Sequence, residues 1–250
     1  MMHHIELSDV RSDSPAVPPG RRVYAVGDIH GRRDLLALLM DRIDADSRSR
    51  PVEKPVEIYL GDYIDRGPDS RGVIDLLIAR ARTRETICLK GNHEALLLQF
   101  MRQPDVLATW RHYGALPTLA SYGLYPSLNP SETEQKRLSA GLRGALTGDH
   151  TRFLASLVPC AAMGDFLFVH AGVKPGIPLS RQTEHDMMWI REDFLKHESS
   201  FEKMIVHGHT PVTAPEFRTN RINVDTGAYA TGRLSCVVIE GSDLRVLATD

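Results

Sequence analysis

Apolar runs and helical stretches alternate along the first hundred residues of the chain. Residues 23–26 form a short apolar run, and residues 34–43 carry leucine and isoleucine at helical spacing. Two more such pairs follow, at residues 56–60 with 70–82 and 86–89 with 94–101. Strands that alternate with helices are typical of a parallel sheet with right-handed crossovers. The pattern therefore predicts an α/β fold in which three strands end at one edge of a sheet.

The second half of the chain has a different character. Short apolar or alternating runs are separated by glycine and aspartate turns, at residues 157–163, 166–169, 204–206, 222–224, 234–239 and 244–247. We expect these runs to form a second sheet that packs on the first, giving two mixed sheets. Between the halves, residues 104–150 are rich in helix formers and polar residues, which predicts a helical insertion beside the site.

One domain accounts for a chain of this length. With 250 residues, of which 42% are hydrophobic and 25% charged, the composition is ordinary for a globular protein. We expect residues 21–250 to form a single domain that includes the insertion. Residues 1–20 hold three prolines between Ser12 and Gly20 and are expected to be a flexible lead-in.

Charge and cysteine content narrow the class of protein. The formal net charge is −2 and neither half has a long basic run, which argues against nucleic acid or a membrane surface as a partner. No apolar run has the length of a membrane span or the form of a secretory signal. The three cysteines form no Cys-x-x-Cys pair and are expected to be buried thiols in a reducing compartment. We therefore expect a cytoplasmic protein, with its oligomeric state left open.

Side chains with metal-ligand chemistry follow the predicted strands of both halves. They are Asp28, His30, Asp62, Asn92, His170 and His209. Hard oxygen and imidazole ligands suit manganese, iron or zinc. A shared Asp62 divides them into two sets, one of Asp28, His30 and Asp62 and the other of Asp62, Asn92, His170 and His209. Both cations then keep open positions for water and substrate, as a catalytic site requires.

The charge of these sets favours a phosphate substrate. Two divalent cations outweigh the two ligand carboxylates, and the remaining positive charge suits a dianionic phosphomonoester whose oxygens Arg66 can bind. A water held between metals about 3.5–4 Å apart is placed to attack phosphorus in line. The leaving oxygen then needs a proton. His93, next to Asn92, can supply it while Asp65 orients the imidazole ring.

Five short motifs carry these residues in order along the chain. They are Gly27-Asp28-Ile29-His30-Gly31, Gly61-Asp62-Tyr63-Ile64-Asp65-Arg66-Gly67, Gly91-Asn92-His93-Glu94, His170-Ala171-Gly172 and Gly208-His209-Thr210. Together they resemble the signatures of the calcineurin-like metallophosphoesterases, and more closely the bacterial and phage serine/threonine phosphatases of the phosphoprotein phosphatase branch. Residues 188–192 and 225–228 also match the phage-type enzymes. Any one motif alone is a weak signal, but five in order are a strong one.

The resemblance implies a fold, a cofactor and a mechanism. It implies a four-layer αββα sandwich, two divalent metal ions often supplied as manganese, and in-line attack by a metal-bridging hydroxide without a phosphoenzyme. The six residues above become the metal ligands, and His93 becomes the general acid paired with Asp65. Arg66, Arg191 and Asn92 become the residues that bind the substrate phosphate. The implied partner is a phosphorylated protein or peptide, cleaved at phosphoserine or phosphothreonine, with phosphotyrosine left open.

Substrate preference is the open part of this interpretation. The chain has His-Ala-Gly where eukaryotic members have His-Gly-Gly, and it lacks their C-terminal Ser-Ala-Pro-Asn-Tyr segment. An alternative is a hydrolase of diadenosine polyphosphates or other nucleotides, a group with similar motifs. Asp65 and Glu94 argue against it, because that group has alanine and aspartate at these positions. A non-catalytic metal-binding scaffold is disfavoured because all six ligands are retained together with His93 and Asp65.

Several of these residues also have a purely structural interpretation. A lone aspartate after a strand, such as Asp28, is more often a helix cap or turn residue. Arg191 can be a plain surface residue, although we favour the phosphate role. His207 lies two positions before His209 and is either a ligand or, as we favour, a residue that supports the ligands. Asp225 is expected to be a turn residue or a support, not a ligand.

Overall fold

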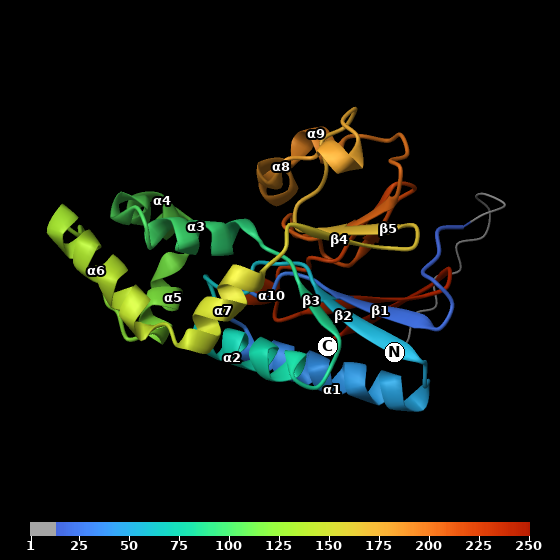
Figure 1. Cartoon of the computed structure of the whole chain (residues 1–250), viewed down its shortest axis with the longest axis horizontal. Coiled ribbons are helices and arrows are strands. Elements are labelled where there is room, and N and C mark those ends of the chain that lie inside the picture. The colour runs from blue at the N-terminus through green and yellow to red at the C-terminus, as the bar shows by residue number, and fades with distance from the viewer. Residues whose placement is uncertain (1–13) are drawn as a thin grey trace.

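The computed structural model describes residues 14–250, and its strands form two five-stranded sheets (Figure 1). The first sheet has the order β10–β9–β1–β2–β3. Its strands are β1 (Arg21–Val26), β2 (Lys54–Tyr59), β3 (Thr86–Cys88), β9 (Ser235–Glu240) and β10 (Asp243–Ala248). β1, β2 and β3 are parallel, as the alternation of strands and helices predicted.

The second sheet has the order β4–β5–β6–β8–β7. Its strands are β4 (Cys160–Met163), β5 (Phe166–Val169), β6 (Met204–His207), β7 (Glu216–Phe217) and β8 (Arg221–Asn223). The three inner strands are parallel to one another, and the two outer strands are antiparallel to their neighbours. Both sheets are therefore mixed, as predicted.

The last two strands do not join the sheet that the sequence predicted for them. β9 pairs antiparallel with β1, with Arg22 opposite Glu240, and β10 completes that edge of the first sheet. Without this pairing, the buried strand β1 would leave a row of backbone groups unpaired. Val237 and Ile239 of β9 still lie in the core between the sheets. Their apolar pattern fits either sheet, so only the pairing of β1 decides between them.

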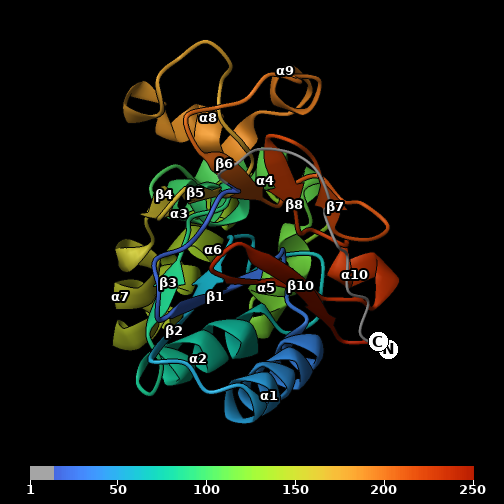
Figure 2. The ribbon, with the colours of Figure 1, turned by 90° about the vertical axis from the view of Figure 1, so that its right-hand side faces the viewer.

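Four layers result, with a hydrophobic core at each of the three interfaces. Figure 1 shows α1 (Arg33–Ser49) and α2 (Ser70–Ala81) on the outside of the first sheet, and α8 (Glu184–Trp189) and α9 (Glu192–Leu195) on the outside of the second. Figure 2 shows the same order of layers in a view turned by 90°. Tyr24, Leu36 and Ile74 represent the first core, Val56, Phe168 and Val206 the second, and Val169, Phe194 and Ile205 the third. The predicted αββα sandwich is confirmed.

Helix α1 runs past the predicted end at residue 43 to Ser49. Its last two turns are mostly polar, so the apolar spacing gave no sign of them. Asp46 in this part is buried, and it accepts hydrogen bonds from Tyr24 Oη at 2.8 Å and from Arg245 Nη1 at 2.6 Å. A buried carboxylate with charged and neutral donors is compensated, which holds the polar end of the helix against the sheet.

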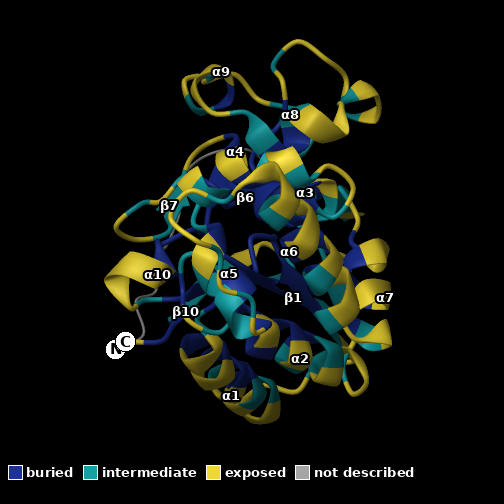
Figure 3. Ribbon diagram, turned by 90° about the vertical axis from the view of Figure 1, so that its left-hand side faces the viewer, coloured by how far each residue is buried: buried dark blue, intermediate teal, exposed yellow. Residues whose placement is uncertain are grey.

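The insertion consists of helices, as predicted, and lies beside the two sheets (Figure 1). Its elements are η1 (Pro104–Val106), α4 (Leu107–His112), α5 (Ala115–Ser121), α6 (Glu132–Ala145) and α7 (Gly148–Ser156). Trp110, Leu119 and Leu142 extend the core that α1 and α2 form with the first sheet. Figure 3 shows buried residues on the inward faces of these helices and exposed residues on their outward faces. The remaining helices are α3 (Asn92–Phe100), η2 (Leu179–Arg181) and α10 (Ala228–Thr231).

The expected flexible lead-in lies partly outside the described residues, which begin at residue 14. Residues 14–20 differ from that expectation. The Ala16 N–H donates to Asp165 Oδ2 and the Val17 N–H donates to the Gly241 carbonyl, each at 3.0 Å. Val17 is buried in the core between the sheets. Two backbone hydrogen bonds and one buried side chain therefore hold this stretch against the sheets, and such contacts with distant residues have no signal in the local sequence.

No helix within residues 14–250 combines the length and the apolar character needed to cross a bilayer.

Candidate metal centre

The predicted ligands lie on loops that leave the carboxyl ends of strands in both sheets. Asp28 and His30 follow β1, Asp62 follows β2, and Asn92 opens α3 after β3. His170 follows β5 and His209 follows β6. Parallel strands bring such loops to one edge of a sheet, and the two packed sheets bring both edges together. All six side chains are buried, with at most 5% of each residue exposed.

One group of possible ligands is built around His170. Asp62, His170 and His209 offer ligand atoms that all lie within 4.8 Å of one another. His170 Nε2 lies 3.0 Å from Asn92 Oδ1, 3.1 Å from His209 Nδ1 and 3.4 Å from Asp62 Oδ1. The structure therefore brings together all four residues that the sequence assigned to one metal.

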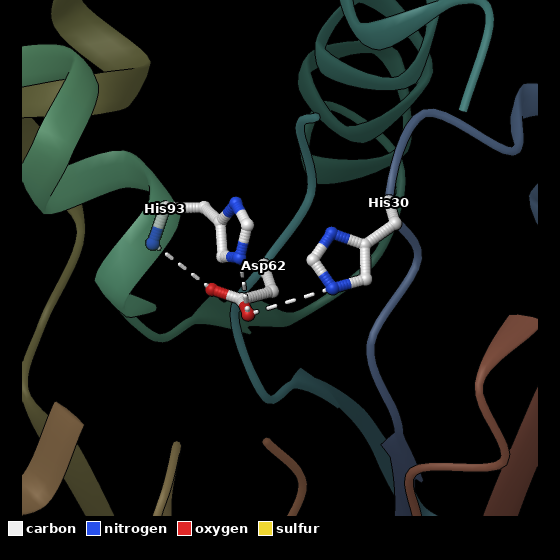
Figure 4. A group of neighbouring side chains, drawn as sticks. All are labelled: His30, Asp62 and His93. Atoms are coloured by element: carbon white, nitrogen blue, oxygen red, sulfur yellow. Dashed lines mark hydrogen bonds and ion pairs between the residues drawn. The ribbon is translucent and has the colours of Figure 1, made fainter. Parts of the chain in front are cut away.

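A second group uses the other oxygen of Asp62. His30 Nε2 and His93 Nε2 each lie 3.6 Å from Asp62 Oδ2, and both rings point toward it (Figure 4). These three residues form the second set whose ligand atoms lie within 4.8 Å of one another. Asp28, which the sequence assigned here, lies outside this group, and it accepts the backbone N–H of His209 at 3.1 Å. It stays close enough to Asp62 and His170 for their charges to act on it.

The imidazole rings are oriented from behind by backbone carbonyls. His170 Nδ1 donates to the Leu60 carbonyl at 2.9 Å, and His30 Nδ1 donates to the Ile64 carbonyl at 2.8 Å. Because a carbonyl oxygen only accepts, Nδ1 of each ring carries a proton, and Nε2 is the atom that faces Asp62. Support of this kind is typical of metal-binding histidines.

Backbone strain is concentrated in the same loops. In residues 14–250, the non-glycine residues with positive φ are His30, Asp62, Asp65, Arg66 and His209. Their φ angles lie between 46° and 72°. Each such residue costs on the order of 1–3 kcal/mol, and strain of this kind clusters at functional sites. It turns the side chains of adjacent positions toward a single point.

Three carboxylates are buried close together at the centre. Burial, together with the negative charges of Asp225 and Asp62, raises the pKa of Asp28 well above its usual range. Burial and the charge of Asp62 also act on Asp225, whose pKa rises to about 6. Burial acts in the same direction on Asp62, but the positive charges of His170 and His93 hold its pKa well below the usual range. Three buried carboxylates so close together are what two divalent cations would stabilise.

The histidines fit the same interpretation. Burial and the charge of His170 lower the pKa of His209 to about 2, and burial lowers the pKa of His30 well below its usual range. A metal ligand must be neutral, so these two rings are in the required state. Burial opposes protonation of His170, but the charge of Asp62 raises its pKa to about 10. A cation on Nε2 would replace that proton. The donor set therefore fits two divalent metals.

Glu94 joins the loops that carry Asp62 and Asn92. Its carboxylate accepts the backbone N–H groups of Asp62 and Gly91 at 3.0 Å each and that of Tyr63 at 2.8 Å. Gly91 packs so closely against Asp62 that a Cβ atom there would clash with the carboxylate. From the sequence, Glu94 served only to separate substrate classes. Its position as the third residue of α3 was a signal for a capping role that was missed.

His93 and Asp65 form a closely hydrogen-bonded pair. His93 Nδ1 donates to Asp65 Oδ2 at 2.6 Å, and both residues are almost fully buried. Burial lowers the pKa of His93, but the charge of Asp62 and the hydrogen bond to Asp65 outweigh it and raise the pKa overall. With Nδ1 on Asp65, it is Nε2 that faces the centre. The structure thus brings together the two residues that the sequence assigned to proton donation.

The two predicted phosphate-binding arginines border the centre. Arg66 Nη2 lies 3.4 Å from His93 Nε2, and its guanidinium stacks 4.6 Å above the ring of Tyr229. Arg191 Nη1 donates to Thr210 Oγ1 at 3.0 Å, and Thr210 is the residue that follows His209 in the chain. Tyr229 is partly exposed, and its ring meets the His30 ring edge to face, with the ring centroids 5.3 Å apart. Its part in the site had no sequence signal, because it lies in the short helix α10.

Two further residues named from the sequence lie close to the ligands. His207 is outside both ligand groups, and its ring contacts Phe194 edge to face at 4.9 Å. Burial lowers its pKa to about 3, and its Nε2 atom has no hydrogen-bond partner among residues 14–250. Asp225 accepts the Gly227 N–H at 2.8 Å, as a turn residue does, while its charge acts on Asp28.

Comparison with protein-family models gives one match, which spans residues 21–236. Its description is calcineurin-like phosphoesterase. The matched range contains every predicted ligand as well as His93, Asp65 and both arginines.

Curated relatives carry a name that differs from the predicted substrate class. Over 236 residues the chain is 25% identical to bis(5′-nucleosyl)-tetraphosphatase PrpE (asymmetrical) of Anoxybacillus flavithermus, covering 85% of this chain and 88% of the relative. The protein of the same name from Geobacillus thermodenitrificans is 26% identical over 236 residues, with the same coverage.

Solved structures with the same fold include enzymes of two kinds. A crystal structure provisionally assigned as a diadenosine tetraphosphatase has a TM-score of 0.61 and 21% identity, covering 94% of this chain and 98% of that one. The cold-active protein-tyrosine phosphatase of a psychrophilic Shewanella species has a TM-score of 0.55 and 16% identity, covering 94% and 83%. At such identities the similarity establishes the fold alone.

Proposed function

Because the chain belongs to the calcineurin-like phosphoesterase family, we propose that it is a dimetal phosphomonoesterase acting on phosphoserine and phosphothreonine in proteins or peptides. The carboxylate and imidazole donors suit manganese, iron or zinc, and manganese is the proposed metal because the family resemblance implies it. Retention of both ligand groups together with the His93–Asp65 pair argues against a non-catalytic scaffold.

The observation that carries the proposal is the hydrogen bond between His93 and Asp65. It directs His93 Nε2 toward the centre and favours its protonated state. Serine and threonine leave as strongly basic alkoxides, which need a proton as the P–O bond breaks. When a polyphosphate is cleaved, the leaving group is a nucleotide whose phosphate oxygen has a pKa of about 6, so it can leave without being protonated. A buried, oriented acid is therefore worth most for an alkyl phosphate ester.

Each side chain then has a role in hydrolysis. Two divalent cations, when bound, supply the positive charge and water activation that attack on phosphorus requires. Asp62 offers one oxygen to each ligand group, and the proposed sets are completed by Asp28, His30, Asn92, His170 and His209. Arg66 and Arg191 bind the phosphate oxygens and offset their charge. His93 Nε2 gives its proton to the leaving oxygen, while Nδ1–H stays on Asp65.

Cleavage of dinucleoside tetraphosphates is the second candidate. It is favoured by the name that the curated relatives carry at 25–26% identity. Both candidates use the same metals and the same arginines, so these groups do not separate them. The difference lies in the leaving group and thus in the need for His93.

A substrate panel tests the proposal directly. Manganese-loaded enzyme is assayed on phosphoserine, phosphothreonine and phosphotyrosine peptides and on diadenosine tetraphosphate, with chelator-treated enzyme as the control. We expect kcat/KM for the phosphoserine and phosphothreonine peptides to exceed that for the tetraphosphate by about tenfold or more. Faster release of nucleotides from the tetraphosphate would replace the first candidate by the second.

Arg191→Ala is expected to weaken substrate binding without changing metal content. An arginine bound to phosphate oxygens is a charge-assisted donor, and losing it should lower kcat/KM by about 10- to 100-fold. The control is Arg137→Ala, an exposed arginine on the outer face of α6. Steady-state kinetics and metal analysis of both variants give the answer. Unchanged kinetics for Arg191→Ala would leave Arg66 as the arginine that binds the phosphate.

A further inference from the structure

Two residues of the helical insertion reach the carboxylate that orients His93. Trp110 of α4 donates from Nε1 to Asp65 Oδ2 at 2.7 Å, and Thr118 of α5 donates from Oγ1 to Asp65 Oδ1 at 2.5 Å. Both residues are fully buried. Asp65 lies 45 and 53 positions away from them in the chain, so these are tertiary contacts between the insertion and the site.

The contacts account for both oxygens of the carboxylate. Oδ2 accepts from His93 Nδ1 and Trp110 Nε1, and Oδ1 accepts from Thr118 Oγ1. The Thr118 hydroxyl also accepts the Asp65 backbone N–H at 2.8 Å and lies 2.9 Å from Ser70 Oγ. The backbone and the side chain of Asp65 are thus held by the same hydroxyl. A carboxylate with its oxygens bonded on both sides cannot rotate about its terminal torsion without losing hydrogen bonds.

The direction of the Trp110 ring separates this arrangement from ordinary core packing. The ring contacts Phe100 at 5.4 Å and belongs to the apolar core of α1 and α2. A buried indole needs an acceptor for its N–H, and any backbone carbonyl would suffice. Here the acceptor is the same Asp65 oxygen that receives His93 Nδ1.

We propose that Trp110 and Thr118 are positioning residues for proton donation. They fix the Asp65 carboxylate so that it holds the Nδ1–H of His93 and keeps Nε2 directed at the leaving oxygen. This inference rests on the proposed role of His93. It also gives residues 107–121 of the insertion a definite role, since they form a scaffold behind His93 and Asp65. Trp110 is buried within this scaffold and does not face the substrate.

The test compares two substrates of nearly equal shape. The leaving group of p-nitrophenyl phosphate is weakly basic. That of phenyl phosphate is more basic, because its conjugate acid is a phenol with a pKa of about 10. A misplaced acid harms the second substrate more than the first, because only the more basic leaving group depends on the proton. A variant that merely loosens the fold lowers both rates together.

Trp110→Phe keeps an aromatic ring and removes the N–H, and Thr118→Val keeps the shape and removes the hydroxyl. We expect each to lower kcat/KM on phenyl phosphate by about 10- to 100-fold, with a much smaller loss on p-nitrophenyl phosphate and unchanged metal content. Thr118→Ser retains the hydroxyl and should stay near the wild type. Tyr122→Phe is the matched control, because its hydroxyl bonds His150 Nδ1 at 2.9 Å from the end of α5 without touching Asp65.

A second measurement does not depend on turnover. In zinc-loaded protein, the His93 Nδ1 proton in its short hydrogen bond should give a downfield signal in the proton spectrum, identified by its loss in His93→Asn. We expect that signal to shift in Trp110→Phe and Thr118→Val but not in Tyr122→Phe. This comparison also covers the case in which a variant folds too weakly for reliable kinetics.

The outcomes separate the two proposals. If His93→Asn itself lowers kcat/KM equally on both substrates, the assignment of His93 as the acid is wrong. If His93→Asn discriminates between the substrates while Trp110→Phe and Thr118→Val do not, the acid assignment stands and the positioning role is overturned. Equal losses on both substrates in the two positioning variants would likewise overturn that role.

Discussion

Asp62→Asn is expected to remove both metal ions and to lower turnover by roughly 10³-fold or more. Asp62 Oδ1 lies 3.4 Å from His170 Nε2, and Oδ2 lies 3.6 Å from His30 Nε2, so each ligand group depends on one oxygen of the same carboxylate. Asparagine keeps the shape of the side chain and tolerates the positive φ of 51° at this position. The fold should therefore survive the substitution while both metals are lost.

Metal analysis and thermal unfolding measure this result together. Metal at a hundred times its Kd stabilises a folded protein by about 2.7 kcal/mol. For a chain of this size, manganese should then raise the wild-type Tm by roughly 5–10 °C. The increase should vanish in Asp62→Asn. Asp46→Asn is the control, since this buried aspartate pairs with Arg245 and Tyr24 far from the ligands and should lower the Tm without changing metal content. Two full equivalents of metal in Asp62→Asn would rule out the bridging role.

His93→Asn is expected to lower turnover by about 10²- to 10⁴-fold while both metals remain bound. The loss should be greater on phenyl phosphate than on p-nitrophenyl phosphate, because the more basic leaving group depends on the proton. Metal content is decisive here, since His93 Nε2 lies as close to Asp62 Oδ2 as His30 Nε2 does.

The matched control for this variant is His150→Asn. His150 is buried and hydrogen-bonded to Tyr122 and Asp75 in the outer helices, so its loss should affect stability and leave turnover and metals unchanged. Near-normal turnover of His93→Asn would contradict the acid assignment. Loss of one metal equivalent would instead make His93 a ligand of the group that contains His30.

Most of the fold could be predicted from the sequence because strand and helix periods differ. The alternation over residues 23–101 indicated three parallel strands and their crossovers, and short apolar runs indicated a second sheet. The partners of β9 and β10 could not be predicted. An apolar strand buried on one face gives the same pattern in either sheet, and only the free edge of β1 selects the pairing that is observed.

The candidate site was predictable to a similar depth. Short motifs at strand ends identified Asp62, Asn92, His170 and His209, and the structure brings them together. The hydrogen bond from the His209 backbone to Asp28 was not predictable, because it joins loops of the two sheets that are 181 positions apart in the chain. The position of Glu94 near the start of α3 indicated its capping role. No sequence pattern indicated that Trp110, Thr118 and Tyr229 lie at the site.

The sequence by itself determined the chemistry of this protein and the order of its elements. Residue type, spacing and strand period are local properties, and local properties decide which side chains end up at which strand end. The tertiary structure alone decided how those side chains face one another. It placed one oxygen of Asp62 in each ligand group, and it directed Trp110 and Thr118 from a distant insertion to Asp65. Such contacts join residues that share no sequence period, so only the packing of the completed chain specifies them.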